Sequence, residues 1–572
     1  MAPKVVYKVR EDAPDDVSAQ LGTDDALLAK LLWHRGLTTP EDVAAFLNPD
    51  YEAHLHDPFL MTDMDVAVTR ILRAIKDGEN IIIYSDYDCD GIPGGVALHD
   101  FFVSIGFENF ENYIPHRHEE GFGFNEKAVE KFKESGAALI ITIDCGTSDL
   151  AAAKAAKEAG IDVIITDHHE PGAELPDVHA LLNPKRDDAY PFRGLCGAGV
   201  VYKLVQALII KGKETGAFNL KEGQEKWLLD MVGLATIADM VPLVGENRAL
   251  AHYGLTVLRK SRRPGLHHLF RKTRTNQRYL TEDDIGFTLG PRINAASRMD
   301  TPEDAFHMLA TQDEEEAGTR VLHLEKLNNE RKGVVAAMVK DAKRRLEKLE
   351  ALPAVIVMGD PSWRPSLVGL VANTLAETYK RPAFLWGRDG QGMIKGSCRS
   401  GGGSLTSLME AAGDHFLEAG GHEGAGGFSV AADKIHTLAD ALEAVHTNTK
   451  KEGVEEMHEA FMDADLSLED VTDSFVRSLG RLAPFGEANA KPLFRFKEVT
   501  PARVEVFGKT KNHTRVVFET AAGTREAIAF FREAEDFVRP PKAGAPLTLI
   551  AHVEESFFMG RREIRLRIVE IV

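Results

Sequence analysis

Short apolar runs that end in acidic residues recur through the first half of the chain. The run at residues 81–84, IIIY, is followed by carboxylates at alternate positions, Asp86, Asp88 and Asp90. An uninterrupted apolar run of this length is typical of a buried strand, and the glycine-rich stretch 91–95 after it indicates a turn. Similar runs occupy residues 112–115, 138–143, 162–166 and 179–183, with helical patterns such as 150–159 between them. This alternation predicts a doubly wound parallel sheet.

The three carboxylates after the first run have two interpretations. Side chains at alternate positions of an extended segment share one face, and the carboxyl end of a buried strand is where open α/β sheets bind ligands. Like charges at such spacing repel each other, and hard divalent cations take carboxylate oxygens as ligands. The stretch is therefore either an acidic turn that ends a strand or half of a cation site, and by itself it does not decide between them.

Three further segments end in the same way. Asp144 follows the run 139–143, Asp-His-His at 167–169 follows the run 163–166, and Asp239 follows a helical pattern at 228–238. A single Asp in such a place is usually a cap or a turn residue, but the carboxyl ends of parallel strands meet at one edge of a sheet. We expect one crevice to collect Asp86, Asp88, Asp90, Asp144, Asp167, His168, His169 and Asp239.

Carboxylates mixed with imidazoles favour octahedral Mn²⁺ or Mg²⁺ over tetrahedral Zn²⁺. Two such ions close together form the kind of site that hydrolyses phosphate esters. The residues alone therefore predict a metal-dependent phosphodiesterase or phosphatase. Within the first acidic motif, we expect Asp86 and Asp88 to be ligands and Asp90 to hold the turn.

One long helical pattern without proline spans residues 313–349 and predicts a connector between two lobes. Apolar residues recur at a heptad-like spacing, at Ala317, Val321, Leu324, Val335, Met338, Ala342 and Leu349. The polar residues Asn328 and Arg331 interrupt this stripe. They mark either a solvated bend or a point that faces a cleft, and we favour the cleft.

Beyond the long helix, the pattern predicts a second α/β unit and then an all-β domain. Strands at 354–358 and 383–386 flank a helix at 366–378, and glycine-rich loops are expected at 401–403 and 420–427. Five short strands then predict a small OB-type barrel, at residues 503–507, 514–519, 526–531, 547–554 and 561–569.

Composition narrows the class of protein. A chain of 572 residues has room for three or four domains. The chain has 68 Lys and Arg residues and 88 Asp and Glu residues, which makes it acidic, with a net charge of −20. Binding of nucleic acid would therefore need local basic patches or metal ions. The four cysteines are isolated, which argues against zinc ribbons and disulfide frameworks and suits a reducing cytosol. We expect a cytoplasmic protein, because neither a secretory signal nor a membrane-spanning stretch is visible.

At the acidic motifs described above, which include Asp-His-His at 167–169, the sequence resembles the DHH phosphoesterase superfamily. Within that superfamily it resembles the RecJ family of single-strand-specific 5′→3′ DNA exonucleases. The motifs that carry the resemblance extend along nearly the whole chain. They are RGLTTPEDVAAFLNP (35–49), DYDCDG (86–91), YIPHRHEEGFGFN (113–125), DCGTSD (144–149), TDHHEPG (166–172), NPKRDDAYPFRGLCGAGVVYKL (183–204), IADMVPLVGENR (237–248), GPRINAASRMD (290–300), WRPSLVGLVA (363–372), KGSCRS (395–400), GGHEGAGGF (420–428) and PFGEANAKPLF (484–494).

The resemblance implies five parts. A helical segment (1–75) would pack on a DHH lobe (76–300), and a long helix (301–350) would join that lobe to a smaller α/β DHH-associated lobe (351–455). An OB-type nucleic-acid-binding domain with a helical lead-in (456–572) would follow. Together they predict degradation of single-stranded DNA from a 5′-phosphorylated end to mononucleotides, with two Mn²⁺ or Mg²⁺ ions. The implied context is DNA repair and recombination, as a monomer whose protein partners are a single-strand-binding protein or a helicase.

Residue roles also follow from the resemblance. It implies metal ligands at Asp86, Asp88, Asp144, His168 and Asp239, and catalytic support from Asp90, Asp167, His169 and His422. It implies a 5′-phosphate pocket of Arg117, Ser397 and Arg399, and strand contacts at Arg292, Asn294 and Arg298. Lys509, Lys511, His513 and Arg515 offer positive charge on the predicted barrel.

Simpler structural roles stay open for several of these residues. Arg292 and Arg298 could pin the long helix, Arg399 could form an ion pair, and His422 could pack within its loop. The basic residues of the barrel could belong to a solvated hairpin. The chain also departs from the family pattern at Ser85, Pro93, Cys398 and Gly426.

Two other functions remain as alternatives. A hydrolase of very short oligonucleotides or cyclic dinucleotides would use the same chemistry, but such relatives are shorter. A DNA-binding scaffold without activity would have lost its metal-binding acids, and the predicted ligands are intact here.

Overall fold

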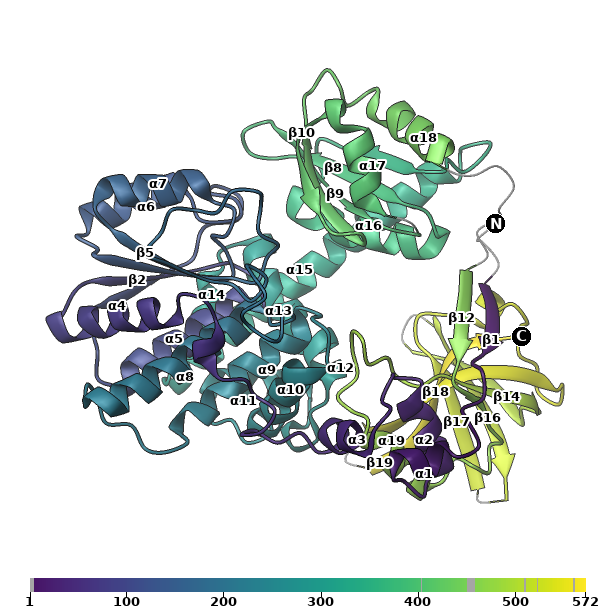
Figure 1. Ribbon diagram of the computed structural model, residues 1–572. Coiled ribbons are helices and arrows are strands. Elements are labelled where there is room, and N and C mark those ends of the chain that lie inside the picture. The colour runs from purple at the N-terminus through teal and green to yellow at the C-terminus, as the bar shows by residue number, and fades with distance from the viewer. Residues whose placement is uncertain (1–4, 403, 450–457, 509–510, 522, 559–560) are drawn as a thin grey trace.

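The computed structural model describes residues 5–402, 404–449, 458–508, 511–521, 523–558 and 561–572. Two α/β lobes are joined by one long helix, and a β-rich domain lies beside the first lobe (Figure 1). Among the described residues, no helix combines the length and the apolar character that crossing a membrane requires.

The first lobe is built on a five-stranded parallel sheet in the order β3-β2-β4-β5-β6. Its strands are β2 (Ile81–Ser85), β3 (Phe110–Tyr113), β4 (Leu139–Ile143), β5 (Asp162–Thr166) and β6 (Ala180–Leu182). The chain runs from β2 to β3 on one side and then crosses back to β4 on the other. The strand order therefore reverses between β2 and β4, which is where doubly wound sheets bind ligands. The predicted parallel sheet is confirmed.

Helices cover both faces of this sheet (Figure 1). One face is covered by α4 (Met64–Asp77), α5 (Gly91–Ser104) and α8 (Gly197–Thr215), and the other by α6 (Glu126–Glu134) and α7 (Leu150–Ala159). The lobe is completed by α9 (Leu229–Ala238), α10 (Gly245–Leu258), α11 (Pro264–Thr273), α12 (Glu282–Asp284), the π-helix η4 (Ile285–Leu289), α13 (Gly290–Met299) and α14 (Glu303–Ala310). Because α5 already begins at Gly91, Pro93 lies in a first helical turn, where its missing N–H costs little.

The connecting helix α15 (Glu314–Leu346) has 33 residues and belongs to both lobes. Val321 and Leu324 are buried in the core of the first lobe, whereas Met338 and Ala342 are buried in the core of the second. The predicted connector is therefore confirmed, and its polar interruption lies where the helix passes from one core to the other. Leu349, placed in the stripe by the sequence pattern, lies beyond the helix and is half exposed.

The second lobe is a five-stranded sheet in the order β10-β11-β9-β8-β7, in which only β7 and β8 run parallel. Its elements are β7 (Ile356–Gly359), α16 (Pro365–Tyr379), β8 (Ala383–Arg388), β9 (Ile394–Arg399), α17 (Leu405–Ala411), β10 (Phe416–Gly421), β11 (Ala425–Val430) and α18 (Leu438–Thr449). The glycine-rich loop expected at 420–427 was wrong, because most of it forms the paired strands β10 and β11.

Two departures from the family pattern face each other in this sheet. Gly426 on β11 is the register partner of Cys398 on β9, and a Cβ built on Gly426 would lie 2.9 Å from the Cys398 Sγ atom. The same Cβ would also lie 2.9 Å from the Gly420 carbonyl oxygen and 3.0 Å from Met409 Cε. Cys398 is therefore one of three contacts that favour glycine at position 426.

The Gly426→Ala variant is expected to lose stability, because the added methyl group overpacks a buried contact, at a cost of about 1–3 kcal/mol. Adding Cys398→Gly should restore part of that loss by removing the opposing sulfur, while the close approach to the Gly420 carbonyl oxygen remains. A calorimetric melt of both single variants and the double variant measures the coupling between the two sites. If the two effects simply add, the close contact is not the reason for the pairing.

The C-terminal domain is one seven-stranded sheet in the order β13-β14-β18-β19-β17-β16-β15. Its strands are β13 (Ala464–Asp465), β14 (Phe494–Val499), β15 (Arg503–Phe507), β16 (His513–Thr520), β17 (Gly523–Ala529), β18 (Leu547–Phe558) and β19 (Arg561–Ile571). In the described part of the chain no ladder joins β15 to β13, so the sheet is not a closed barrel. The predicted OB-type strands are present, and the sequence pattern missed β14.

The first helices of the chain pack on the C-terminal domain. The strand β1 (Val5–Val9) pairs with β12 (His458–Met462). One hydrophobic core contains side chains of the first helices, of the seven-stranded sheet and of α19 (Asp473–Gly480). The helices in that core are α1 (Val17–Leu21), α2 (Ala26–Trp33) and α3 (Pro40–Leu47). The expectation that the whole segment 1–75 packs on the first lobe was therefore wrong. The stretch from Tyr51 to the end of α4 packs there, whereas α1, α2 and α3 share the core of the C-terminal domain. The apolar faces of these helices are visible in the sequence, but the surface that covers them is not.

Candidate metal centre and phosphate pocket

The carboxyl ends of β2, β4 and β5 carry one aspartate each, in register with its neighbour. The backbone N–H of Asp86 donates to the Ile143 carbonyl at 3.0 Å, and the N–H of Asp144 donates to the Thr166 carbonyl at 2.8 Å. These bonds continue the parallel ladders one residue past the strands. They hold Asp86, Asp144 and Asp167 side by side at the point where the strand order reverses, as the sequence predicted.

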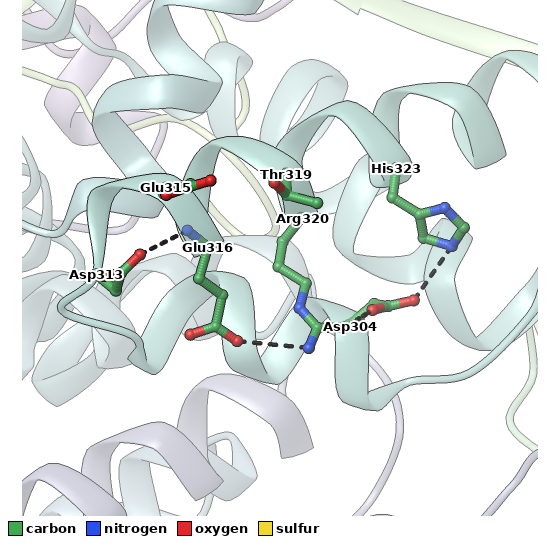
Figure 2. A pocket seen from close by; sticks show the side chains of 7 residues that line it. All are labelled: Asp304, Asp313, Glu315, Glu316, Thr319, Arg320 and His323. Carbon is green, nitrogen blue, oxygen red and sulfur yellow. Dashed lines mark hydrogen bonds and ion pairs between the residues drawn. The ribbon is translucent and has the colours of Figure 1, made fainter.

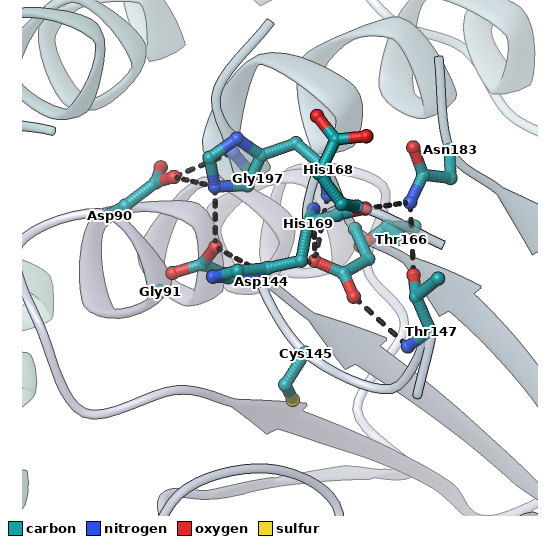
Figure 3. A network of polar contacts seen from close by, with 12 residues as sticks. Asp90, Gly91, Asp144, Cys145, Thr147, Thr166, His168, His169, Asn183 and Gly197 are labelled. Carbon is teal, nitrogen blue, oxygen red and sulfur yellow. Dashed lines mark hydrogen bonds and ion pairs between the residues drawn. The ribbon is translucent and has the colours of Figure 1, made fainter. Parts of the chain in front are cut away.

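Three groups of possible ligand atoms meet in this crevice, each with its atoms within 4.8 Å of one another. They are Asp86 with Asp88 and Asp144, Asp90 with His168 and Asp239, and Asp144 with His168 and His169. His168 stands at the centre (Figure 3). Its Nε2 atom lies 3.1 Å from Asp144 Oδ1, 3.6 Å from Asp90 Oδ2 and 3.7 Å from Asp239 Oδ2.

In the turn after β2, the hydrogen bonds of Asp88 and Asp90 differ from those that the sequence predicted. Asp88 Oδ1 accepts hydrogen bonds from the N–H groups of Asp90 and Gly91 at 2.8 and 3.2 Å, so Asp88 closes the turn. The carboxylate of Asp90 instead accepts from the N–H groups of Gly197 and Ala198, at 2.6 and 2.8 Å. Asp90 is thus anchored on the N-terminus of α8, where the helix dipole favours a carboxylate.

Asp167 orients the second histidine of the motif. Its Oδ1 atom lies 2.8 Å from His169 Nδ1 and also accepts from the His168 N–H, while its Oδ2 accepts from the Thr147 N–H. Burial opposes the charge on His169, but the hydrogen bond to Asp167 outweighs it and raises the pKa of His169 to about 9. The His169 ring is therefore cationic at neutral pH. His168 differs, because burial and the neighbouring His169 lower its pKa to about 3, which leaves a neutral imidazole for a metal.

A bound cation would compete with protons for several of the other carboxyl groups, because their pKa values are raised. Burial, followed by the charges of neighbouring acids, raises the pKa of Asp86 and Asp144, and raises that of Asp239 to about 9 and that of Asp90 to about 6. The Oδ1 atoms of Asp86 and Asp144 are buried without a hydrogen-bond partner. Buried oxygens of this kind normally have a partner, so a divalent cation fits this donor set.

Metal affinity is expected to rise between about pH 7 and about pH 8.5, because bound cations must displace protons from carboxyl groups such as Asp239. The folded metal-free protein binds more protons than the unfolded chain wherever a carboxyl pKa is raised, so its stability falls as pH rises through this window. His169, whose pKa is also raised, contributes with the same sign. Melting temperatures with EDTA and with saturating Mn²⁺ should therefore diverge as pH increases. A difference that stays constant would contradict these protonation states.

A second cluster of acids does not qualify as a metal site. A cavity at the start of α15 is lined by Asp304, Asp313, Glu315, Glu316, Thr319, Arg320 and His323 (Figure 2). Arg320 forms ion pairs with Asp304 and with Glu316, and His323 Nε2 lies 3.2 Å from Asp304. The guanidinium group already supplies the positive charge that a metal would bring.

The residues expected to bind a 5′ phosphate come from both lobes. Ser397 and Arg399 lie side by side on β9 next to Gly369 of α16, where an added Cβ would lie 3.2 Å from Arg399 Nη2 and 3.3 Å from Ser397 Oγ. Arg399 donates to the Cys398 carbonyl and forms no ion pair with any described carboxylate. Arg117 of the first lobe lies over the Tyr87 ring, 4.7 Å from its centroid. The ion-pair alternative for Arg399 is therefore wrong.

The residues on α13 have different environments. Arg292 pairs with Glu325 of α15 at 2.6 Å, so it does pin the long helix. The Oδ1 atom of Asn294 is buried without a partner, and Arg298 donates to the Ser366 carbonyl at 2.8 Å. His422 lies in the turn between β10 and β11, and its charge makes a small contribution to the lowered pKa of His168.

Sequence reasoning missed Lys185, whose charge acts on both His168 and Asp239. It follows β6 within three residues, so the strand-end signal that found the acids also marks this lysine.

The basic hairpin of the C-terminal domain is only partly described, because Lys509 lies outside the described residues. Arg515 lies 3.6 and 3.7 Å from Glu505 and Glu526, and its guanidinium stacks over Phe507 at 5.2 Å. Its charge is therefore largely offset. His513 Nδ1 accepts a hydrogen bond from the Phe531 N–H at 2.9 Å, so Lys511 is the described residue that carries what remains of the predicted basic surface.

Three family models match consecutive parts of the chain. They are the N-terminal domain of the DHH family over residues 80–236, the DHHA1 domain over residues 352–448 and the RecJ OB domain over residues 462–570.

Known proteins match over nearly the full chain. The single-stranded-DNA-specific exonuclease RecJ of Bacillus subtilis is 35% identical over 549 residues, which cover 95% of this chain and 67% of that protein. The enzyme of the same name from Dickeya dadantii is 31% identical and is covered to 95%, as is this chain. The crystal structure of RecJ in complex with Mn²⁺ from Thermus thermophilus matches with a TM-score of 0.81 and 26% identity, covering 100% of this chain and 80% of that one. Its complex with Mg²⁺ matches with a TM-score of 0.75 and 25% identity, covering 99% and 78%.

Proposed function

The chain belongs to the RecJ family of single-stranded-DNA-specific exonucleases, and from this premise we propose that it removes mononucleotides from the 5′ end of single-stranded DNA. It is a metal-dependent enzyme that uses Mn²⁺ or Mg²⁺. The observation that carries the proposal is the meeting of three ligand groups, with two unpartnered buried carboxylate oxygens, at the switch point of the sheet.

We assign the metal ligands to Asp86, Asp88, Asp144, His168 and Asp239. When bound, two ions at such a site supply an activated water and offset the charge of the phosphoryl group. Asp90 fixes the position of the neighbouring ligands from the α8 N-terminus.

We assign charge stabilisation to the second histidine of the motif. Asp167 holds a proton on His169 Nδ1 and so keeps a cationic ring beside Asp144. That positive charge favours a phosphate in the crevice. We also assign to His422, in the turn between β10 and β11 of the second lobe, a contact with the scissile phosphate.

We assign the 5′ end of the strand to the pocket of Arg117, Ser397 and Arg399. Guanidinium groups bind phosphate oxygens in a forked geometry, and Arg399 has no competing carboxylate. A terminal phosphate seated there would place the next phosphodiester towards the metal centre. This arrangement supports release of one nucleotide at a time.

The Arg399→Ala variant is expected to lose most of its preference for 5′-phosphorylated over 5′-hydroxyl strands, by about tenfold or more, because one charge-assisted contact is removed. Competition between the two labelled strands measures the preference directly. Arg388→Ala, an exposed arginine at the end of β8, is the matched control and should keep the ratio. An unchanged ratio in Arg399→Ala would refute the pocket.

The function is tested with Mn²⁺ and end-labelled single strands, duplexes and dinucleotides. Mononucleotides released only from the 5′ end of single strands are the expected result. Preferred cleavage of dinucleotides would instead indicate an oligonucleotide hydrolase, and binding without cleavage would indicate a scaffold. A role in DNA repair and recombination, action as a cytoplasmic monomer, and supply of strands by a helicase or a single-strand-binding protein complete the proposal.

A further inference from the structure

Three helices meet where the two lobes join (Figure 1). Met299 at the end of α13 and Val334 and Val335 of α15 pack against the core that contains Leu367 and Val368 in the first turns of α16. The polar residues beside these apolar contacts must therefore lie close together. They are Arg298 on α13, Arg331 on α15 and Ser366 on α16.

The arrangement of these side chains is built from specific hydrogen bonds. Arg298 Nη1 donates to the Ser366 carbonyl at 2.8 Å, and Ser366 Oγ donates back to the Arg298 carbonyl at 2.9 Å. On α15, Arg331 Nη2 donates to Asn328 Oδ1 at 2.9 Å. Both guanidinium groups are thus held in place and keep donors to spare.

The positive charges at this junction have no ion-pair partner among the described carboxylates. None of these forms an ion pair with Arg117, Arg298, Arg331 or Arg399, whereas the nearby Arg292 has Glu325 as its partner. Burial, followed by the charges of Arg117 and Arg331, lowers the pKa of Arg298 to about 9, and the charge of Asp88 offsets this only in part. A cluster of like charges that repel each other in this way is a ready site for an anion.

Unpartnered donors in the same cluster point to a ligand. Asn328 is completely buried, and its Nδ2 atom has no hydrogen-bond partner. The Nε atom of Arg331 is also buried without a partner. Buried donors are rarely left unpaired, and the N-terminal turns of α16 add the positive end of a helix dipole.

We propose that Asn328 and Arg331 of the connecting helix, together with Arg298, bind the terminal phosphate of the strand. This inference rests on the proposed function in taking the anion to be a 5′ phosphate. It extends the pocket of Arg117, Ser397 and Arg399 to a third structural unit. The phosphate would then be held by the first lobe, the connecting helix and the second lobe at once, so its binding ties the two lobes together.

The test compares thymidine 5′-monophosphate with thymidine, which lacks the phosphate, by calorimetric titration of the Mn²⁺-loaded enzyme. Arg331→Ala is expected to weaken binding of the monophosphate by about tenfold or more and to leave thymidine unchanged. Asn328→Asp should act in the same direction, because its carboxylate would neutralise Arg331. Arg344→Ala is the control, since Arg344 is exposed on the same helix and already pairs with Asp341.

Equal affinity for the monophosphate in Arg331→Ala and the wild type would overturn the proposal, as would an equal loss for thymidine. If Arg331→Ala does not fold, Arg331→Lys keeps the charge without the planar fork and should still weaken phosphate binding several-fold. Unchanged binding in that variant would count against the site. Strand cleavage by the wild type is measured separately, so failure of the proposed function and failure of this subsite are distinguishable.

Discussion

The Asp144→Asn variant is expected to lose strand cleavage by about a thousandfold or more, while its metal-free form unfolds at a higher temperature than the wild type. Asp144 belongs to two of the three ligand groups, and its Oδ1 atom is buried without a hydrogen-bond partner. Removing its charge removes a ligand that no neighbour replaces.

The gain in stability has a separate cause. Burial, followed by the charges of Asp90, Asp88 and Asp86, raises the pKa of Asp144, so an ionisable carboxyl group at this position lowers the stability of the folded metal-free protein at neutral pH. Asparagine has no ionisable carboxyl group and also tolerates the left-handed backbone at this position, where φ is 61°. Alanine would add backbone strain at this positive φ, and that strain would mask the expected rise in melting temperature.

Initial rates on a 5′-phosphorylated single strand and calorimetric melts in EDTA measure the two effects. Asp177→Asn is the matched control, because Asp177 is exposed and pairs with Lys157, another surface residue. Full activity in Asp144→Asn would exclude the two-metal assignment. A lower melting temperature would show that the acids of the crevice do not repel each other in the folded state.

The Lys203→Met variant is expected to be destabilised by about 3–5 kcal/mol, because it leaves a buried carboxylate without its partner. Lys203 Nζ lies 3.0 Å from Glu246 Oε1 and donates to the His56 carbonyl at 2.5 Å. Both side chains of the pair are fully buried. Glu246 also accepts hydrogen bonds from the Tyr190 hydroxyl and the His56 N–H.

This pair ties the segment before α4 to α8 and α10, so its loss should loosen the connection between the first lobe and the chain that leads to it. The free energy of unfolding from urea titrations measures the effect. Lys211→Met, on the same helix but exposed, should cost little. Adding Glu246→Gln to Lys203→Met should recover part of the stability, because no unpaired charge is then buried. A double variant no better than the single one would show that packing, and not charge, sets the cost.

The two lobes contribute different parts of the site. The switch point of the parallel sheet supplies the metal ligands, because Asp86 and Asp144 follow the two strands between which the order reverses. The second lobe supplies Ser397 and Arg399, which Gly369 allows to lie against α16. The connecting helix contributes polar side chains as well as joining the lobes. Asn328 and Arg331 lie where α15 passes from the core of the first lobe to the core of the second.

Several features of the site followed from the sequence because their causes are local. Apolar runs of strand length specify buried strands, and residues directly after parallel strands must share an edge, so Asp86, Asp144 and Asp167 could be placed together. The heptad-like stripe of α15 was equally visible, because helical periodicity depends only on neighbouring residues. The chemistry of the metal centre follows from the side chains themselves.

Other features were decided by tertiary structure, because they depend on which surfaces meet. The sequence determined that α2 and α3 have apolar faces, but only the fold shows that the C-terminal domain covers them. Gly426 seemed typical of a loop until its strand partner, Cys398, was known. The anchoring of Asp90 depends on where the α8 N-terminus lies. The buried donors of Asn328 and Arg331 become unpaired only when folding removes them from water. Periodicity and side-chain chemistry are local properties, whereas burial and partner choice arise from contacts between segments far apart in the chain.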